Sequence, residues 1–168
     1  KNGHDSVLVV TDKGLMGLGL LNPLFEALEA EGIKYSVFDS VQPNPTIYNV
    51  EDALKMYNEN GCEGFIAFGG GSPMDCAKVT AARVVKPEQP IEKMRGIMKI
   101  GKKLPPFFAV PTTAGTGSEC TLAAVVSNPK THEKYACNDS VLRPPYVVFD
   151  PELTVGLPPH ITSTTGMD

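Results

Sequence analysis

A chain of 168 residues, 42% hydrophobic and 20% charged, is long enough to bury the core of one globular domain. Its net charge of −4 argues against nucleic acid and anionic membranes as partners, because both require a basic surface. No apolar run approaches the roughly 20 residues of a membrane span and the N-terminus lacks the apolar core of a signal peptide, so we expect a cytoplasmic protein.

Strand and helix patterns alternate along the first half of the chain. Short runs rich in β-branched and aromatic residues predict strands that are apolar nearly throughout, as in a sheet covered on both faces. Helical patterns separate the first three strands and stop at Gly32 and Gly61. The β-α-β-α-β-α order predicts an α/β fold, a Rossmann-like parallel sheet with helices on both faces. The predicted strands are Val7–Thr11, Tyr35–Phe38, Phe65–Phe68, Phe107–Val110 and Tyr146–Phe149, and the predicted helices are Pro23–Glu31 and Ile47–Asn60.

Two later segments depart from this alternation. The proline- and lysine-rich stretch 86–106 is interpreted as a surface loop with at most one short helix. Between Thr121 and Tyr135, two extended pieces flank Asn128-Pro129-Lys130, which predicts a β-hairpin added to the edge of the sheet. Neither segment marks a domain boundary, so residues 1–168 are treated as one domain.

A glycine-rich turn, Gly69–Gly71, follows the third predicted strand. Glycines remove the Cβ atoms that would keep a diphosphate from the backbone, and the N–H groups at the start of the next helix face the anion. Ser72 is expected to cap this helix, with Pro73 in the first turn and Asp75 completing a capping box. The segment predicts a phosphate-binding turn, and a tight turn without a ligand is the alternative.

Polar residues gather where the predicted strands end. Asp12 follows the first strand and Asp39 the second, and a carboxylate there can bind an adenosine ribose and repel a 2′-phosphate. Position alone does not choose between them, and either can simply cap a turn. Pro111–Glu119 follows the fourth strand with four hydroxyls and two glycines, enough to bind a ribose and a ring amide, or to form a polar loop. Gly14–Gly19 has the wrong glycine spacing for a dinucleotide fingerprint and is interpreted as a loop.

The cysteines and histidines do not have the spacing of metal ligands. The cysteines form no C-x-x-C pair, and we interpret them as buried free thiols. The histidines are scattered, without a second histidine or a carboxylate at helical ligand spacing, so we expect no metal site built from them. These residues are Cys62, Cys76, Cys120, Cys137, His4, His132 and His160.

Six segments form an ordered pattern along nearly the whole chain: Val10–Lys13, Pro43–Thr46, Phe68–Asp75, Pro111–Glu119, Asp150–Pro151 and Thr165–Asp168. In order and spacing they resemble the iron-containing (group III) alcohol dehydrogenases. The resemblance implies an NAD(P)-binding domain whose crevice faces an all-helical, metal-binding C-terminal domain. That second domain would begin at about residues 158–168 and would otherwise be absent from this chain.

The resemblance assigns cofactor-binding roles to matching positions. It makes Asp12, rather than Asp39, the carboxylate on the adenosine ribose, which favours NAD over NADP. It places Lys134 on the nicotinamide ribose, although read alone this residue would be a solvated surface lysine. The other implied positions are Asn44 on the adenosine side, Gly70, Gly71, Ser72, Pro73 and Asp75 at the pyrophosphate turn, Thr112, Thr113 and Thr116 in the groove, and Thr121 and Val125 as neighbours.

The resemblance also makes Asp168 the first ligand of a metal, Fe²⁺ or Zn²⁺, whose other ligands are histidines of the helical domain. One carboxylate cannot hold a divalent ion alone, so we expect this chain to be an inactive fragment of a longer dehydrogenase. The parent would interconvert a primary alcohol and its aldehyde by hydride transfer. The catalytic residues and the alcohol are not specified by this chain, and homo-oligomer formation is left open.

Three other interpretations compete with this one. A zinc-type glycerol dehydrogenase or dehydroquinate synthase would share the fold and the glycine-rich turn. A phosphotransferase acting on a nucleoside triphosphate would require acidic magnesium ligands beside the turn. A non-catalytic nucleotide-binding fragment would bind a cofactor without performing chemistry.

Overall fold

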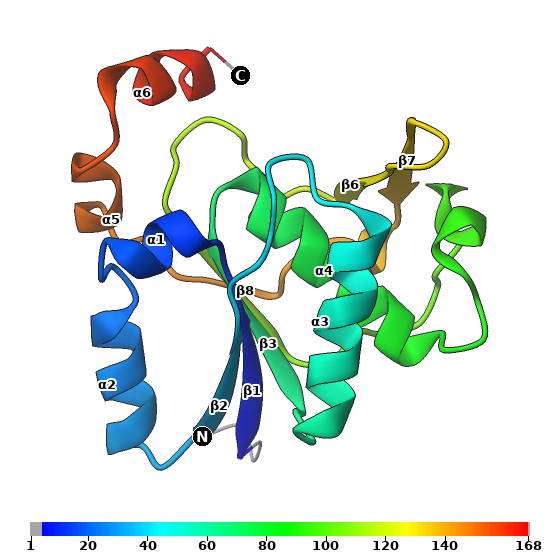
Figure 1. Cartoon of the computed structure of the whole chain (residues 1–168), viewed down its shortest axis with the longest axis horizontal. Coiled ribbons are helices and arrows are strands. Elements are labelled where there is room, and N and C mark those ends of the chain that lie inside the picture. Colours follow the sequence, from blue (N-terminus) through cyan, green and yellow to red (C-terminus); the bar gives the residue numbers. More distant parts are fainter. Residues whose placement is uncertain (1–4, 168) are drawn as a thin grey trace.

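The computed structural model describes residues 5–167, in which a five-stranded parallel sheet carries helices on both faces and a smaller sheet lies beside it (Figure 1). The strand order is β2-β1-β3-β5-β8, and all four pairings are parallel. The predicted α/β class is therefore confirmed, with strand ends shifted by one or two residues. The strands are β1 (Ser6–Val10), β2 (Lys34–Phe38), β3 (Gly64–Gly69), β5 (Phe107–Pro111) and β8 (Tyr146–Val147).

Alternate residues of the central strands face two different hydrophobic cores. Leu8 and Phe65 belong to the core beneath α3 and α4, whereas Val9 and Ile66 belong to the core beneath α1 and α2. Because both faces are covered, the strands are apolar throughout. The helices are α1 (Lys13–Gly17), α2 (Asn22–Ala30), α3 (Ile47–Glu59), α4 (Gly71–Val85), α5 (Glu152–Val155) and α6 (Pro159–Thr165). None of the described helices is long and apolar enough to cross a membrane.

Local signals explain where α2 and α3 begin and end. Thr46 and Asn49 form a reciprocal capping box at the start of α3, a feature that the sequence analysis did not predict. Gly32 and Gly61 follow the two helices with φ of 67° and 59°, a left-handed conformation that glycine adopts without a Cβ penalty. The predicted helix ends are therefore confirmed.

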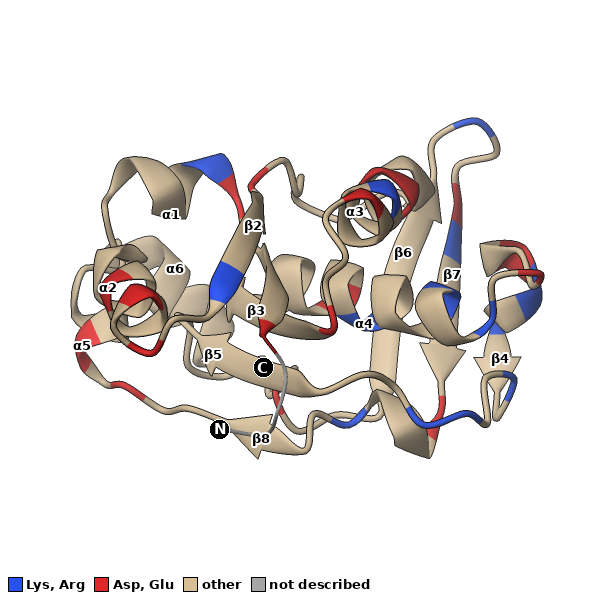
Figure 2. Ribbon diagram, turned by 90° about the horizontal axis from the view of Figure 1, so that it is seen from below, with Lys and Arg blue, Asp and Glu red and all other residues tan. Residues whose placement is uncertain are grey.

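The predicted hairpin exists, but its predicted place at the edge of the main sheet is wrong. β6 (Ala123–Asn128) and β7 (Glu133–Asn138) pair antiparallel, and β7 pairs with β4 (Gly96–Ile97) in a separate three-stranded sheet. Ala124 and Val126 are buried in the same core as α4, so β6 packs onto that helix. Figures 1 and 2 show this second sheet on the far side of α4 from α1 and α2. Figure 2 also shows acidic and basic residues interspersed along the ribbon.

Residues 86–106 are more than a surface loop. They contain the expected short helix, η1 (Ile91–Met94), and also β4, while Ile91, Met94 and Ile100 are buried. The Asp139 carboxylate holds this excursion by accepting hydrogen bonds from the backbone N–H groups of Ile100 and Gly101, at 3.0 and 2.9 Å. Desolvation acts to raise the pKa of Asp139, but the backbone N–H groups around it hold the pKa below its ordinary value.

We expect Asp139→Ala to lower the free energy of unfolding by about 3 kcal/mol at pH 7, because buried N–H groups lose a charged acceptor. The pKa of Asp139 is lower in the folded state, so its contribution is present above the ordinary value and is lost as pH falls through the folded pKa. Urea unfolding at pH 7 and at pH 3 measures both effects. Asp52→Ala, at an exposed position on α3, is the control, and equal stability of the two variants would contradict the prediction.

The four cysteines are free thiols, as expected, and three of them are buried. Cys120 is exposed, contrary to expectation, because it lies in the loop that leads from β5 to β6.

Candidate functional site

The candidate site lies where the order of strands in the main sheet changes direction. The chain passes from β1 to β2 on one side and then returns to β3 on the other side of β1. In open α/β sheets, the crevice at the carboxyl ends of the two strands at such a switch point binds ligands. Asp12 follows β1 and the glycine turn follows β3, so the topology brings these two predicted site segments to one edge.

The glycine turn has a different cap from the one predicted. Gly69 ends β3 with φ of 144°, and Gly70, rather than Ser72, is the N-cap residue of α4. Gly70 has no side chain that could accept a hydrogen bond from the first turn of α4. The backbone N–H groups of this turn therefore face the crevice without a side-chain cap. Pro73 lies in the first turn, as predicted. The predicted capping box of Ser72 and Asp75 is wrong, because the chain turns at Gly69 and the helix begins before Ser72.

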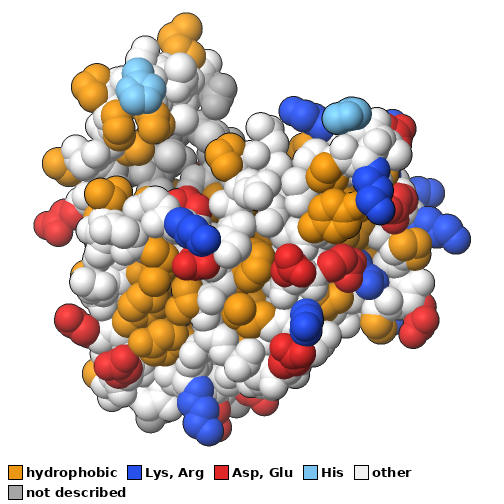
Figure 3. Space-filling view, in the orientation of Figure 1, with side chains coloured by type: hydrophobic (Ala, Val, Ile, Leu, Met, Phe, Trp, Pro, Cys, Tyr) orange, Lys and Arg blue, Asp and Glu red, His pale blue; other side chains and the backbone are white. Residues whose placement is uncertain are grey.

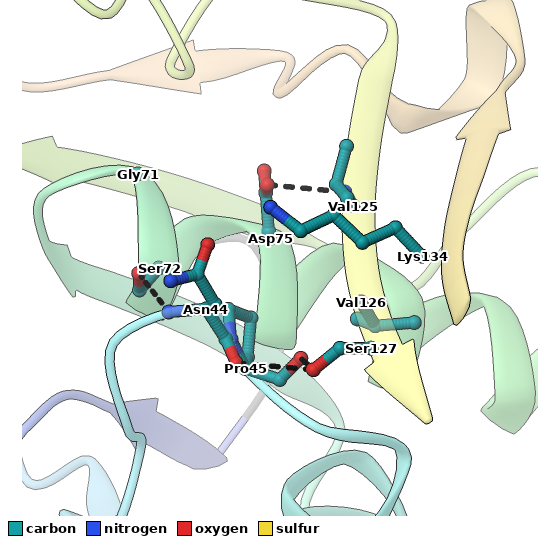
Figure 4. A pocket seen from close by; sticks show the side chains of 9 residues that line it. All are labelled: Asn44, Pro45, Gly71, Ser72, Asp75, Val125, Val126, Ser127 and Lys134. Carbon is teal, nitrogen blue, oxygen red and sulfur yellow. Dashed lines mark hydrogen bonds between the residues drawn. The ribbon is translucent and has the colours of Figure 1, made fainter. Parts of the chain in front are cut away.

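Ser72 and Asp75 bind distant segments instead. The Ser72 hydroxyl accepts a hydrogen bond from the backbone N–H of Asn44 at 3.3 Å, and the Asp75 carboxylate accepts one from Val125 at 3.0 Å (Figure 4). Asn44 has φ of 56°, a left-handed conformation that asparagine tolerates better than most residues. Burial raises the pKa of Asp75 to about 6, although the Val125 N–H and Lys78 act to lower it.

Two cavities share Gly71 and Ser72 at the N-terminal turn of α4. The larger, of about 740 Å³, extends from this turn to Asp12 on one side and to the segment from Leu153 to Ile161 on the other. Figure 3 shows hydrophobic side chains on the projecting part of the molecule, at its upper left, where Figure 1 places α5 and α6. The smaller cavity, of about 170 Å³, lies between α4 and β6. The first turn of α4 therefore lies between the two cavities, which together make up the candidate site.

The two cavities divide most of the predicted site residues between them. Asn44 was expected on the adenosine side with Asp12, but it lines the smaller cavity with Lys134. Figure 4 shows the Lys134 side chain pointing across that cavity toward Asp75. Thr116 and Thr121 line neither cavity. The larger cavity contains Asp12, Gly70, Gly71, Ser72, Pro73, Thr112 and Thr113, and the smaller contains Asn44, Gly71, Ser72, Asp75, Val125 and Lys134.

Asp12 has a structural contact as well as its place in the larger cavity. Its carboxylate accepts a hydrogen bond from the Leu15 N–H at 3.0 Å and so caps α1. The interpretation of residues 14–19 as a loop is therefore wrong for residues 14–17, because this cap starts a short helix that runs from Lys13 to Gly17. Asp39, the rival carboxylate, accepts a hydrogen bond from the Ser40 hydroxyl and lines neither cavity.

The loop after β5 packs closely against the glycine turn. A Cβ atom at Gly70 would lie 3.3 Å from the Thr113 hydroxyl, and one at Gly71 would lie 3.2 Å from Ser118 Oγ. Glycine at both positions therefore keeps the space between turn and loop open. Thr113 Oγ1 is buried without a hydrogen-bond partner, so a polar ligand atom in this space would satisfy it. The accessible backbone at Gly70 and Gly71, the uncapped start of α4 and the unpartnered Thr113 hydroxyl together suit the binding of a diphosphate.

A family model described as iron-containing alcohol dehydrogenase matches residues 1–151. The chain belongs to this family.

Known relatives agree with the family assignment. Alcohol dehydrogenase 4 of Schizosaccharomyces pombe is 38% identical over 99% of this chain and 39% of its own length. The solved alcohol dehydrogenase of Oenococcus oeni superposes with a TM-score of 0.94 at 35% identity, over 99% of this chain and 44% of that one. The solved sulfoacetaldehyde reductase of Bifidobacterium kashiwanohense, in complex with NAD⁺, gives a TM-score of 0.84 at 37% identity, over 98% and 43% of the two chains. The chain thus spans less than half the length of these relatives.

The metal ligand implied by the family resemblance is not part of the described structure. Asp168 lies outside residues 5–167. Within residues 5–167, no group of three or more histidine, cysteine, aspartate or glutamate side chains is placed to hold a metal ion. The described residues therefore fit a dinucleotide but do not by themselves fit a metal ion.

Sequence reasoning missed Lys78, a fully buried lysine on α4. Its Nζ donates hydrogen bonds to the carbonyl oxygens of Ser118, Thr121 and Ala123, at 2.7, 2.9 and 3.0 Å. Burial lowers the pKa of Lys78 to about 8. The available signal was a lysine within an otherwise apolar stretch of helix, since Cys76, Ala77 and Val79 around it are all buried.

Proposed function

We propose that this chain is the NAD-binding half of a metal-dependent alcohol dehydrogenase that interconverts a primary alcohol and its aldehyde by hydride transfer. The observation that carries the proposal is the pair of cavities that share the uncapped turn of α4. One cavity ends at Asp12 and the other contains Lys134. An anion site between the Asp12 carboxylate and the Lys134 ammonium suits a dinucleotide, and a solved relative is in complex with NAD⁺.

The residues of each cavity have separate tasks in this proposal. The diphosphate binds the N–H groups at the start of α4, where Gly70 and Gly71 have no Cβ atoms to keep it from the backbone. Asp12 accepts hydrogen bonds from the adenosine ribose in the larger cavity, which Thr112 and Thr113 also line. Lys134 donates to the nicotinamide ribose in the smaller cavity, beside Asn44, Asp75 and Val125. Bound NAD supplies the chemistry, since its nicotinamide ring accepts a hydride from the alcohol or returns one to the aldehyde.

Two of the expected contact residues have a supporting role in this proposal. Thr121 accepts a hydrogen bond from Lys78 through both its hydroxyl and its carbonyl oxygen, and the Thr116 hydroxyl accepts one from the Ser118 N–H. Both residues therefore shape the loop beside the cofactor. Asp168 is retained as a proposed ligand of iron or zinc.

The competing phosphotransferase proposal needs acidic magnesium ligands beside the turn. The carboxylates that line the two cavities are Asp12 and Asp75, and each already accepts a hydrogen bond from a backbone N–H. The geometry therefore favours a dinucleotide over a magnesium-bound nucleoside triphosphate.

Titration with NADH and NADPH tests the proposed function. We expect wild-type chain to bind NADH and to bind NADPH much more weakly, because the Asp12 carboxylate repels a 2′-phosphate. Asp12→Asn keeps an oxygen to cap α1 but removes the charge, so it should narrow the difference between the two cofactors about tenfold or more. Enhancement of nicotinamide fluorescence measures both affinities, and the chain has no tryptophan to interfere.

Asp39→Asn is the matched control for this experiment, since it removes the rival carboxylate outside both cavities. Its cofactor preference should equal that of wild type. Absence of NADH binding by folded wild-type chain, or a change of preference in the Asp39 variant instead, would refute the proposed site.

A further inference from the structure

Three polar residues of α4 each bind a segment that is distant in the sequence. Ser72, Asp75 and Lys78 are spaced by three residues, so they lie along one side of the helix, beginning at the glycine turn. Ser72 binds the backbone of Asn44, and Asp75 binds the backbone of Val125. Lys78 extends the series to the segment from Ser118 to Ala123. One side of α4 thus holds the backbone of the walls around the smaller cavity.

Lys78 makes the most extensive of these contacts. Its ammonium has four acceptors: three carbonyl oxygens and Thr121 Oγ1, the last at 3.1 Å. An ammonium has three protons to donate, so these acceptors use its whole capacity. The Lys78 side chain is fully buried and lines neither cavity, so it does not reach a ligand itself.

The segment that Lys78 holds lines neither cavity itself but connects two parts of the predicted cofactor site. At one end, Ser118 Oγ lies where a Cβ at Gly71 would come within 3.2 Å, next to the diphosphate turn. At the other end, β6 begins at Ala123 and presents Val125 to the smaller cavity. A displacement of residues 118–123 would therefore change both the diphosphate turn and the cavity of Lys134.

Burial at this position desolvates the Lys78 ammonium. The titratable groups that face it are Asp75 on its own helix and Glu119 and Cys120 on the loop, and all three act to raise its pKa. Burial outweighs them and lowers the pKa to about 8. A methionine would fill similar space without this cost, but it would leave three carbonyl oxygens without their donor.

We propose that Lys78 is a positioning residue for the dinucleotide, because its hydrogen bonds hold residues 118–123 against α4, and this segment leads from the glycine turn to the cavity-lining residue Val125. This inference rests on the proposed function, since it assigns the two cavities to a bound dinucleotide. It adds a residue that touches neither cofactor nor substrate.

Amide hydrogen exchange and NADH titration of Lys78→Met test the inference. We expect the opening of residues 118–125 to become at least tenfold more frequent, while β3 and α3 keep their protection. NADH affinity should fall about tenfold or more, with the preference for NADH over NADPH unchanged because Asp12 is not disturbed. Lys55→Met, whose side chain is 72% exposed on α3, is the matched control and should behave as wild type.

The pH profile tests whether the Lys78 amino group is released from its buried position when the segment opens, which a general loss of stability would not show. The pKa of Lys78 is about 8 in the closed site and returns to its ordinary 10.5 when the segment opens, so opening takes up a proton between these values. Raising the pH from 7 to 9 should therefore reduce the opening of residues 118–125 roughly tenfold in wild type. The same profile should be flat in Lys78→Met.

The outcomes distinguish the inference from the proposed function. If folded wild-type chain binds no NADH, the proposed function fails. If wild type binds NADH and Lys78→Met keeps the same affinity and the same protection of 118–125, the inference alone fails. Should Lys78→Met not fold, the wild-type pH profile decides, because a pH-independent opening of 118–125 would overturn the role of Lys78.

Discussion

Replacement of Gly71 by aspartate is expected to weaken NADH binding at least a hundredfold while leaving the chain folded. Gly71 is the first residue of α4 and lines both cavities, so a carboxylate there would face the negatively charged diphosphate. Its Cβ would meet only Ser118 Oγ, at 3.2 Å, a side chain that can rotate away. A negative charge in the first turn also interacts favourably with the helix dipole, by about 0.3–1 kcal/mol. Binding and stability should therefore change in opposite directions.

Gly71→Asn is the matched control for this prediction, because asparagine has nearly the size of aspartate but no charge. We expect the asparagine variant to lose part of the affinity through bulk and the aspartate variant to lose nearly all of it. Fluorescence titration with NADH and thermal unfolding of both variants provide the measurements. Equal affinities of the two variants would show that the turn does not bind the diphosphate.

Replacement of Gly69 by alanine is expected to give the largest loss of stability among single glycine substitutions in the turn, about 2–5 kcal/mol. Gly69 has φ of 144°, a conformation that side chains rarely adopt. A Cβ there would lie 2.7 Å from Cγ of Pro73, whose ring cannot rotate away, and 3.1 Å from a methyl group of Leu15. Backbone strain and steric overlap therefore act together at the end of β3.

Two other glycines separate these contributions. Gly61 has φ of 59°, and a Cβ added there would have no atom within 4 Å, so Gly61→Ala should cost only the strain, about 1 kcal/mol. Gly17 has open space and no positive φ, so Gly17→Ala in α1 should be neutral or slightly stabilising. Urea unfolding of the three variants measures the order. A Gly69 variant no less stable than the Gly61 variant would contradict the prediction.

The structure makes α4 the organising element of the candidate site. Its uncapped N-terminus faces both cavities, and its side chains at positions 72, 75 and 78 hold three distant backbone segments. Substitutions on this side of α4 should therefore alter cofactor binding even where they do not line a cavity. Substitutions at its opposite end, near Val85, should act on stability instead.

The sequence by itself determined the features that depend on neighbouring residues. Apolar runs predicted the strands of the main sheet, since strands covered on both faces need no alternation. Glycines placed the ends of α2 and α3, because a left-handed residue after a helix is a local requirement. The glycine turn after β3 was also recognisable from the sequence, because its conformation requires glycine locally. The order of six segments indicated the family that the family model then showed.

Only the tertiary structure decided which partners the polar side chains have. Ser72 and Asp75 have the spacing of a capping box, yet their hydrogen-bond partners lie 28 and 50 residues away along the chain. Lys78 is buried because carbonyl oxygens 40 to 45 residues away surround its ammonium. The hairpin likewise belongs to a second sheet, because β7 forms backbone hydrogen bonds with β4 and the apolar side chains of β6 pack against α4. Local patterns describe what a residue can do with its neighbours, whereas these contacts exist only after distant segments have packed together.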